Sequence, residues 1–511
     1  MNNQIPDQDY VYNALLRYNY LPIGQKYLDD IPIKVFSTED FIPAVADELL
    51  KKCEHTKRVD GFDQIEYRKT RFDNLTRLMH IPHPLAYARL CKCIWKNWNR
   101  NELIRVCKNP NSRLKPAKHD NDRLILGEYE SLEQILMMDS EKFADIRSRL
   151  EISTGKFYKV EADISLFFPS LYTHSIPWAL IGKKKAKKSQ KDGNEWYNQL
   201  DKIQRQLKKN ETQGVPIGPA TSNIMSEIIL FKVDKALRKN GYHQFTRYID
   251  DYEYYCETQE QAEDFILNLE QELRKYLLEL NPKKVQIEEA PFSYQDQWVI
   301  VLRNRLPSKQ NPSPRDIMDF FESIVDIQKR YPEGSILKYA ARSLANSKKF
   351  DKNSADFLLK YLLTIAVHTP SVLPILCQIA KQYDVGTDLD ITPVLKQAIK
   401  FQRSDAICWC LYFIGISGQK LSIRFAEDII ETKDCMSMGM LIALKQHQEK
   451  VVDFLNNTVD PDSEHDCDQY WILLHELNQD CKDFKAYCGR SGLKFLREKN
   501  VQFIKPMNVE T

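Results

Sequence analysis

Hydrophobic and polar residues follow two different patterns along this chain, and the regions of the chain differ in which pattern they show. Between residues 157 and 301, short runs rich in β-branched and aromatic residues lie between longer segments whose apolar positions recur every three or four residues. The first pattern is typical of strands and the second of amphipathic helices. Strands are expected at 158–164, 244–249 and 253–257, and helices at 220–239 and 260–280. This central region is therefore predicted to have an α+β fold.

The flanking regions differ from this pattern. Residues 1–156 mix short aromatic segments with helical stretches such as 85–98. A polar linker with three prolines is expected at 303–315, and strand signals almost vanish beyond it. Helices are expected at 314–329, 354–367, 370–381, 392–401, 405–416, 423–431, 435–445 and 470–477. Short helices joined by brief turns indicate an α-solenoid, with an irregular helical bundle as the alternative because no fixed-period consensus is visible.

Composition limits the classes of protein that fit. The chain has 511 residues, of which 43% are hydrophobic and 28% charged, and its formal net charge is +2. The length predicts two to four domains, and the near balance of charges argues against a generally basic nucleic-acid coat. The first residues lack the basic and apolar regions of a signal peptide, and no run of about 18 apolar residues occurs. A cytoplasmic location without a membrane partner is therefore expected.

The twelve cysteines are scattered and include no Cys-x-x-Cys pair. This spacing does not suggest a zinc site, and a reducing compartment disfavours a disulfide framework. The cysteines are therefore predicted to be free, buried core residues.

Three carboxylates carry the candidate chemistry. Asp250 and Asp251 lie between strand-forming segments, so they are expected at the tip of a hairpin, and Asp163 ends a predicted strand 87 residues earlier. Carboxylate oxygens are the ligands that Mg²⁺ prefers, and two such ions can clamp the attacking and leaving oxygens of a phosphoryl transfer. The three acids, with the backbone carbonyl of Ile164, are predicted to hold two Mg²⁺ ions, or Mn²⁺ in their place. A solvated Asp-Asp turn is the alternative for the hairpin motif taken alone.

A glycine- and proline-rich loop lies between these acids, at residues 213–223. Its glycines allow the backbone to approach a flat ligand closely, and its prolines hold the turn before a helix. A nucleotide base or template strand is expected to lie against this loop, with simple helix capping as the alternative. The residues assigned to this contact are Gly214, Pro216, Gly218 and Ser222.

In this order the motifs resemble the reverse transcriptase family. Asp163 matches the first catalytic Asp of that family, the loop its nucleotide-and-template loop, and Tyr248-Ile249-Asp250-Asp251 its Tyr-x-Asp-Asp hairpin. The resemblance implies a right-hand fingers-and-palm fold, with the three acids as catalytic residues and dNTPs as substrates. It also implies that Lys284 approaches the triphosphate and that Phe168 lies under the sugar, where its ring selects deoxynucleotides. An exposed basic turn and a core aromatic are the alternatives for these two residues.

The loop departs from most of that family at Ile217, where retroelement enzymes usually carry Gln. With residues 171–180, it is similar to the abortive-infection, defence-associated branch of bacterial reverse transcriptases, of the prophage-encoded phage-exclusion type. That resemblance implies a HEAT-like C-terminal domain, antiphage activity, a homo-oligomer of three or more subunits and a phage-encoded trigger. It further implies tyrosine-primed, template-independent synthesis of covalently attached single-stranded DNA. Template-directed copying of RNA and a helical scaffold that senses a phage component are the alternatives.

Three domains are therefore expected: an N-terminal and fingers region at 1–156, a palm at 157–305 and a helical domain at 306–511. In the first, Tyr27 lies shortly before a phrase that resembles the family's N-terminal region and is predicted to prime synthesis. Packing of the fingers is the alternative role for tyrosines in this region. Arg113 and Lys115 are candidates for triphosphate contacts.

A basic stretch lies within the predicted palm. Residues 183–209 include ten Lys or Arg, and the acids in this stretch are Asp192, Glu195 and Asp201. Such a stretch suits a phosphate backbone through counterion release, and a solvated helix face is an equal alternative.

Overall fold

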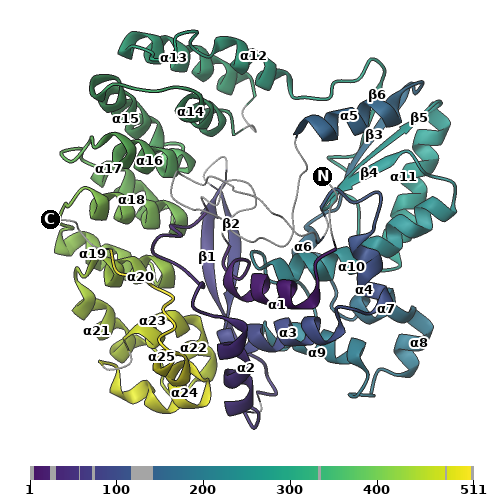
Figure 1. Ribbon diagram of the computed structural model, residues 1–511, viewed down its shortest axis with the longest axis horizontal. Coiled ribbons are helices and arrows are strands. Elements are labelled where there is room, and N and C mark those ends of the chain that lie inside the picture. The colour runs from purple at the N-terminus through teal and green to yellow at the C-terminus, as the bar shows by residue number, and fades with distance from the viewer. Residues whose placement is uncertain are drawn as a thin grey trace.

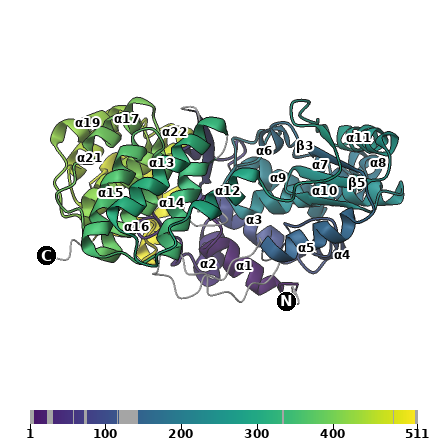
Figure 2. The same cartoon turned by 90° about the horizontal axis from the view of Figure 1, so that it is seen from above.

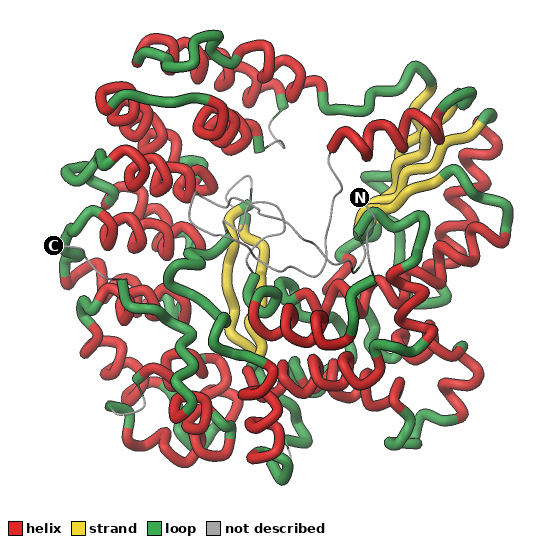
Figure 3. The backbone as a smooth tube through the Cα atoms, viewed as in Figure 1, coloured by secondary structure: helices red, strands yellow, loops and turns green. Residues whose placement is uncertain are grey.

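Two separate sheets and a long succession of helices build the protein (Figures 1 and 3). The computed structural model describes residues 5–22, 30–56, 58–71, 75–114, 116, 142–331, 335–477 and 480–507. Tyr27 and Lys115 lie outside these ranges. None of the helices within the described ranges is long and apolar enough to cross a membrane.

The central region is built on a four-stranded antiparallel sheet of order β4-β5-β3-β6. Its strands are β3 (Tyr158–Asp163), β4 (Phe245–Tyr248), β5 (Asp251–Cys256) and β6 (Gln286–Glu289). Helix α11 (Gln259–Arg274) packs on β3 and β5, and α10 (Ala220–Lys239) packs on α11. The three predicted strands and both predicted helices are therefore confirmed. Helix α11 ends earlier than expected, and the backbone is left-handed soon afterwards at Leu277, where φ is +63°.

Four short helices connect β3 to α10. They are α6 (Phe167–Ser170), α7 (Ser175–Ile181), α8 (Lys183–Lys188) and α9 (Trp196–Gln206). Helix α7 packs against α8, α9 and α10, so this connection covers one side of the central region.

A second sheet, which the sequence did not predict, lies in the N-terminal region. Strands β1 (Gln64–Thr70) and β2 (Thr76–Pro82) form an antiparallel hairpin in which Gln64 pairs with Pro82. In Figures 1 and 2 this hairpin lies between the C-terminal helices on one side and the four-stranded sheet on the other. The helices of this region are α1 (Gln8–Arg17), α2 (Pro43–Lys52), α3 (Pro84–Asn97), α4 (Asn101–Cys107) and α5 (Lys142–Ser153).

Beyond the sheet, every element of the described chain is helical. Ser313 and Asp316 form a capping box that starts α13 (Pro314–Arg330), which explains why the polar linker ends there. Helix α12 (Gln297–Arg305) precedes that linker but packs on α13, and the Trp298 ring meets Tyr339 at 5.3 Å. The succession of helices therefore begins before the linker.

All eight predicted C-terminal helices are present, and others lie between them. Helices that lie close together in the sequence pack on one another along one side of the molecule in Figure 1. The remaining elements are α14 (Ile336–Ser347), α15 (Lys352–Ala366), η1 (Pro370–Val372), α16 (Leu373–Tyr383), α17 (Thr392–Lys400), α18 (Ser404–Ile416), α19 (Ile423–Glu431), α20 (Cys435–Leu444), α21 (Gln448–Thr458), α22 (Glu464–Gln469), α23 (Trp471–Glu476), η2 (Lys482–Phe484), α24 (Lys485–Arg490) and α25 (Leu493–Glu498).

The twelve cysteines are all free and buried, as the sequence predicts. All twelve lie in the hydrophobic core, which runs without interruption from the N-terminal helices into the C-terminal ones. The N-terminal region and the segment after α25 meet in this core, where Phe36 bridges to Ile504 and the Ser37 N–H donates to the Phe503 carbonyl at 3.1 Å.

A buried ion pair joins the N-terminal region to the C-terminal helices. Asp468 on α22 accepts hydrogen bonds from the Arg58 guanidinium at 2.6 Å, the Asp63 N–H at 2.8 Å and the Tyr487 hydroxyl at 2.8 Å. Its side chain has no exposed surface and that of Arg58 is 6% exposed, so neither charge is solvated if the other is removed.

We expect Asp468→Ala to lower the free energy of unfolding by about 3 kcal/mol, because the Arg58 guanidinium would keep only its ion pair with Glu464 at 2.8 Å, and the Asp63 N–H and the Tyr487 hydroxyl would lose a buried acceptor. Urea unfolding measures this loss. The matched control is Asp326→Ala, which removes an acid from the exposed Arg330–Asp326 pair on α13 and is expected to change stability by less than about 0.5 kcal/mol. Equal losses in the two variants would contradict the structural role of Asp468.

Candidate active site

The three predicted acids meet where β3 ends beside the β4–β5 hairpin. Tyr248 pairs with Asp251, so Ile249 and Asp250 form a two-residue turn, and Ile249 has a left-handed backbone with φ of +56°. Asp163 pairs directly with Asp251 across β3 and β5, and the Ile164 N–H donates to the Asp250 carbonyl at 3.3 Å. The expected hairpin tip is confirmed. The length of the turn places Asp251 opposite Asp163 in the backbone register, and the Asp163 carboxylate also acts on Asp250, with which it lines the same cavity.

A buried arginine holds this hairpin from behind. Arg247 on β4 is fully buried and contacts two buried acids of α10, Glu227 at 2.7 Å and Asp234 at 2.9 Å. Its Nη1 also donates to the Ile249 carbonyl at 2.8 Å. Tyr252 and Asn109 donate to Asp234 at 2.9 and 2.6 Å, so the acid has several partners. The guanidinium therefore connects the strained turn to the long helix α10.

The acids of the site raise one another's pKa. Burial and the charge of Asp163 raise the pKa of Asp250 to about 6, although Lys284 and Arg77 act in the opposite direction. The pKa of Asp251 is raised to about 7, first by burial, then by repulsion from Asp250 and by a hydrogen bond to Asp163. Three carboxylates with too little positive charge nearby are a donor set that suits a hard divalent cation.

Lys284 lies against this donor set. Its Nζ donates to Asp163 Oδ2 at 2.8 Å, and the Asn281 N–H donates to the Asp163 carbonyl at the same distance. Within the described ranges, no three His, Cys, Asp or Glu side chains already stand in the geometry of a metal site. The carboxylate oxygens of Asp163, Asp250 and Asp251 are nevertheless the right chemical type for Mg²⁺.

The glycine-rich loop is held between the central region and the second sheet. The Gly214 N–H donates to the Leu171 carbonyl at 2.8 Å, and the Val215 N–H donates to the Phe168 carbonyl at 3.0 Å. Gly218 has φ of +133°, and a Cβ there would lie 3.0 Å from Pro22 and 3.3 Å from the His80 carbonyl. The Ser222 hydroxyl donates to the Pro216 carbonyl at 2.6 Å, which closes the loop onto α10.

Ile217 uses its backbone to pair with β2. The His80 N–H donates to the Ile217 carbonyl at 2.8 Å, and the Ile217 N–H donates to His80 Nδ1 at 3.3 Å. Burial, with the nearby Lys208 charge, lowers the pKa of His80 to about 4, so that the ring is neutral at physiological pH and Nδ1 can accept. The polar groups of Ile217 are therefore occupied, and its side chain is apolar.

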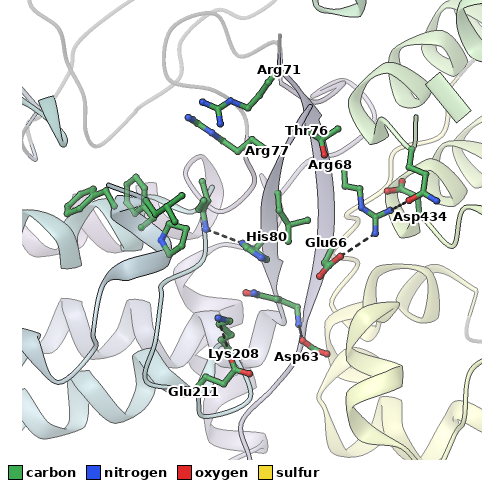
Figure 4. A pocket seen from close by; sticks show the side chains of 18 of the residues that line it. Asp63, Glu66, Arg68, Arg71, Thr76, Arg77, His80, Lys208, Glu211 and Asp434 are labelled. Atoms are coloured by element: carbon green, nitrogen blue, oxygen red, sulfur yellow. Dashed lines mark hydrogen bonds and ion pairs between the residues drawn. The ribbon is translucent and has the colours of Figure 1, made fainter. Parts of the chain in front are cut away.

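A cavity of about 1190 Å³ opens in front of the acids. The central region contributes Asp163, Asp250, Phe168, Ile217 and Lys284 to its lining. Opposite, the β1–β2 hairpin contributes arginines, and the C-terminal helices contribute Glu431, Lys433, Asp434 and Tyr470. Figure 4 shows the hairpin side chains between the central region and Asp434. Three distant parts of the chain therefore enclose one space.

The structure separates the predicted nucleotide-binding residues into two groups. Phe168 and Lys284 line the cavity with Asp163 and Asp250, as does Ile164, which was predicted as a metal ligand. The other described members, Gly214, Pro216, Gly218, Ser222 and Arg113, are absent from its lining. The Arg113 guanidinium lies 5.3 Å from the centre of the Tyr248 ring. The backbone N–H of Arg113 donates to the Arg247 carbonyl, so this residue supports β4.

The sequence interpretation missed the arginines of the β1–β2 hairpin. Arg68, Arg71 and Arg77 line the cavity, and Arg77 is close enough to lower the pKa of Asp250. Figure 4 shows Arg71 and Arg77 side by side near the tip of the hairpin. The alternation of Ile65 and Tyr67 with polar residues was the available signal for this strand.

Arg247→Met is expected to lower the free energy of unfolding by about 3–5 kcal/mol, because Glu227 and Asp234 would be left buried without a cation. Adding Glu227→Gln and Asp234→Asn is expected to recover part of this loss. The triple variant still lacks the donor to the Ile249 carbonyl, so its thermal stabilisation by Mg²⁺ should remain weaker than in the wild type. A full Mg²⁺ response in the triple variant would show that Arg247 does not position the hairpin.

In metal-free protein at pH 8, Asp250→Asn is expected to raise the melting temperature by about 1–3 °C. The folded-state pKa of Asp250 is raised from 3.8 to about 6, so its contribution to stability is present below about pH 4 and is lost as the pH rises through 6. Asn removes the resulting cost of the charged carboxylate at pH 8.

Thermal unfolding in chelator at pH 4 and pH 8, and then with Mg²⁺, measures this effect. The variant should lose the stabilisation that Mg²⁺ gives the wild type, whereas Asp319→Asn on the exposed side of α13 should change neither result. A lower melting temperature of Asp250→Asn in chelator at pH 8 would contradict the proposed charge crowding.

Comparisons with known proteins agree with part of this assignment. Residues 113–299 match the family model described as reverse transcriptase (RNA-dependent DNA polymerase). No curated protein matches the chain. The structure of apo telomerase from Candida Tropicalis is similar over 86% of this chain and 75% of that chain, with 11% sequence identity and a TM-score of 0.30, which is too weak to support an argument about fold. On the family match, the chain contains a reverse transcriptase-like polymerase domain, and such domains transfer nucleotides with divalent metal ions, typically Mg²⁺.

Proposed function

We propose that this protein is an antiphage DNA polymerase of the abortive-infection type, which joins dNTPs without a template and starts from one of its own tyrosines. The observation that carries the proposal is the shared cavity, in which the C-terminal helices form a wall opposite Asp163 and Asp250. A helical domain that served only as a separate sensor would have no need to line this space.

The size of the cavity supports synthesis without a template. Its volume of about 1190 Å³ is only slightly above the roughly 300–1,000 Å³ of ordinary small-molecule sites. A nucleotide with a short single strand would fit such a space. The wall of C-terminal helices opposite the acids therefore supports addition of nucleotides to a single-stranded end.

Ile217 supports the same conclusion through its chemistry. A template base is read by hydrogen bonds, and the backbone N–H and carbonyl of Ile217 are already paired with His80. The apolar side chain that lines the cavity cannot donate or accept such bonds. This position offers an incoming base a surface to lie on, without selecting its identity.

Several side chains in and beside the cavity fit defined roles in the reaction. Asp163, Asp250 and Asp251, with the carbonyl of Ile164, would hold two Mg²⁺ ions. Such ions, when bound, lower the pKa of the attacking hydroxyl and stabilise the pyrophosphate that leaves. Lys284 balances the charge of Asp163, and the half-buried Phe168 ring would exclude a ribose 2′-hydroxyl. Arg71 and Arg77 present positive charge for the triphosphate from the opposite wall.

The priming residue is proposed to be a tyrosine, and two candidates differ in their support. Tyr27 is favoured by the sequence resemblance. Tyr470 is the tyrosine among the described residues of the cavity lining, and its hydroxyl donates to the Lys433 carbonyl at 3.4 Å. The antiphage role, the assembly into trimers or larger homo-oligomers and the phage-encoded trigger rest on the sequence resemblance alone.

Purified protein incubated with dNTPs and Mg²⁺, without nucleic acid, is expected to acquire covalently attached single-stranded DNA. Denaturing electrophoresis detects the product, and mass spectrometry of the digested protein identifies the modified tyrosine. Asp250→Ala should give no product, and Tyr27→Phe should abolish the product whereas Tyr470→Phe should not. The reverse result for the two tyrosine variants would transfer the priming role to Tyr470.

The same experiment includes a primed RNA template in a second reaction. Copying of this template by the wild type, without any product in the template-free reaction, would contradict untemplated synthesis and establish template-directed RNA-dependent DNA synthesis. Phe168→Ala should accept ribonucleotides more readily than the wild type, if the ring lies beneath the sugar.

A further inference from the structure

Helix α8 presents an exposed group of lysines on the outer surface of the central region. Six lysines are exposed on this helix and the turn that follows it: Lys183, Lys184, Lys185, Lys187, Lys188 and Lys191. Only Ala186 of the helix is buried, so a single side chain anchors it. In Figures 1 and 2, α8 lies at the end of the molecule opposite the C-terminal helices.

These lysines differ from most of the remaining basic stretch, in which every cation except the exposed Lys202 is paired with an acid. Arg205 pairs with Asp201 at 3.6 Å, Lys208 with Glu211 at 2.9 Å and Lys209 with Asp63 at 2.8 Å. Lys208 and Lys209 also line the catalytic cavity. None of the six lysines at α8 forms an ion pair with any residue whose position the structure describes.

The unpaired charges oppose the formation of the helix itself. Lys184 is followed by Lys187 and Lys188 at the spacings that bring side chains together on a helix, and like charges at these spacings destabilise it. Between residues 182 and 200 the sequence offers only Asp192 and Glu195 as acids. A bound polyanion would relieve this repulsion and release counterions.

Aromatic residues flank the lysines in the sequence. Trp178 on α7 and Trp196 at the start of α9 are each partly exposed. The Lys183 Nζ is 4.1 Å from the centre of the Trp178 ring, and the Arg100 guanidinium carbon is 4.8 Å from that of Trp196. Tyr172 meets Trp178 edge to face at 5.6 Å, which fixes the orientation of the ring.

We propose that α8, Trp178 and Trp196 form a binding surface for single-stranded nucleic acid outside the catalytic cavity. Proteins that bind single strands combine cations that follow the phosphates with aromatic rings on which bases stack, and both are present here. No residue from 170 to 207 lines the cavity, so the two sites are separate. The surface can hold a strand whether or not the cavity synthesises DNA, so this inference does not depend on the proposed function.

Fluorescence anisotropy with a labelled 30-nucleotide oligo(dT), in the absence of dNTPs, tests the surface directly. The test variant replaces four lysines by Gln, at Lys184, Lys185, Lys187 and Lys188. We expect its Kd at 100 mM NaCl to be at least tenfold higher than that of the wild type. The slope of log Kd against log salt should fall by about 3, since each phosphate contact contributes about 0.7 for a single strand.

The matched control changes the same net charge on the exposed surface of the C-terminal helices and the linker before them, with Lys309, Lys352, Lys360 and Lys494 replaced by Gln. It should bind like the wild type. A further variant, Trp178→Leu, should weaken binding of the oligonucleotide severalfold with an unchanged salt slope, because it removes stacking and leaves the charges in place. Melting temperatures and light scattering confirm that each variant keeps its fold and assembly.

Wild-type affinity and salt slope in the four-lysine variant would overturn the proposal. An equal loss in the charge-matched control would also overturn it, since binding would then follow net charge alone. If the four-lysine variant binds the oligonucleotide normally but changes its oligomeric state, the surface joins protein subunits and does not bind nucleic acid. Because no step requires polymerisation, a protein that makes no DNA still gives a clear result.

Discussion

The buried Arg247 charge determines the position of the candidate active site. Burial works against the charge of its guanidinium, but Asp234 and Glu227 keep its pKa well above the ordinary range. A buried cation needs both partners to remain in place, so β4 cannot shift relative to α10 without leaving charges unpaired. The same guanidinium holds the Ile249 carbonyl, and the backbone of Arg247 is paired with Asn111 and Arg113. The hairpin, the long helix and residues 111–113 therefore form one rigid support.

This support explains how three acids stay together although they repel one another. Backbone pairing of Asp163 with Asp251 and the turn at Ile249 fix the carboxylates on a rigid sheet, so their repulsion appears as raised pKa values and not as movement. The opposite wall of the cavity is supported differently. Arg68 donates its N–H to Ser404, and Thr70 donates to Asp405 at 2.7 Å, so the β1–β2 hairpin is attached to the start of α18. Both walls are thus set by polar contacts outside the cavity.

The helices, strands and motifs that could be predicted from the sequence are those that depend only on residues close together in the chain. The acids, the strands around them and helices such as α19 follow from strong strand formers, fixed motifs and regular apolar spacing. The pairing of Asp163 with Asp251 depends on the register of the turn, which a one-residue difference changes. The β1–β2 hairpin was missed because its polar residues face the cavity and the C-terminal helices, and strand β6 because its residues are mostly exposed. Tyr470 and Glu431 line the same cavity as Asp250. This proximity depends on contacts between distant segments, so a local sequence pattern cannot predict it.

The bridge between Phe36 and Ile504 affects when the catalytic chamber can be completed. The Lys505 N–H also donates to the Val35 carbonyl at 2.7 Å, so the N-terminal region is packed against nearly the last described residues. Ribosomes add about 5–20 residues per second, and an N-terminal segment waits tens of seconds for residue 504 to be made. Until residues 404 and 405 have been made, the hairpin wall lacks its polar contacts with α18. The order of synthesis thus delays a finished chamber until residues 503–505 can pair with the N-terminal region.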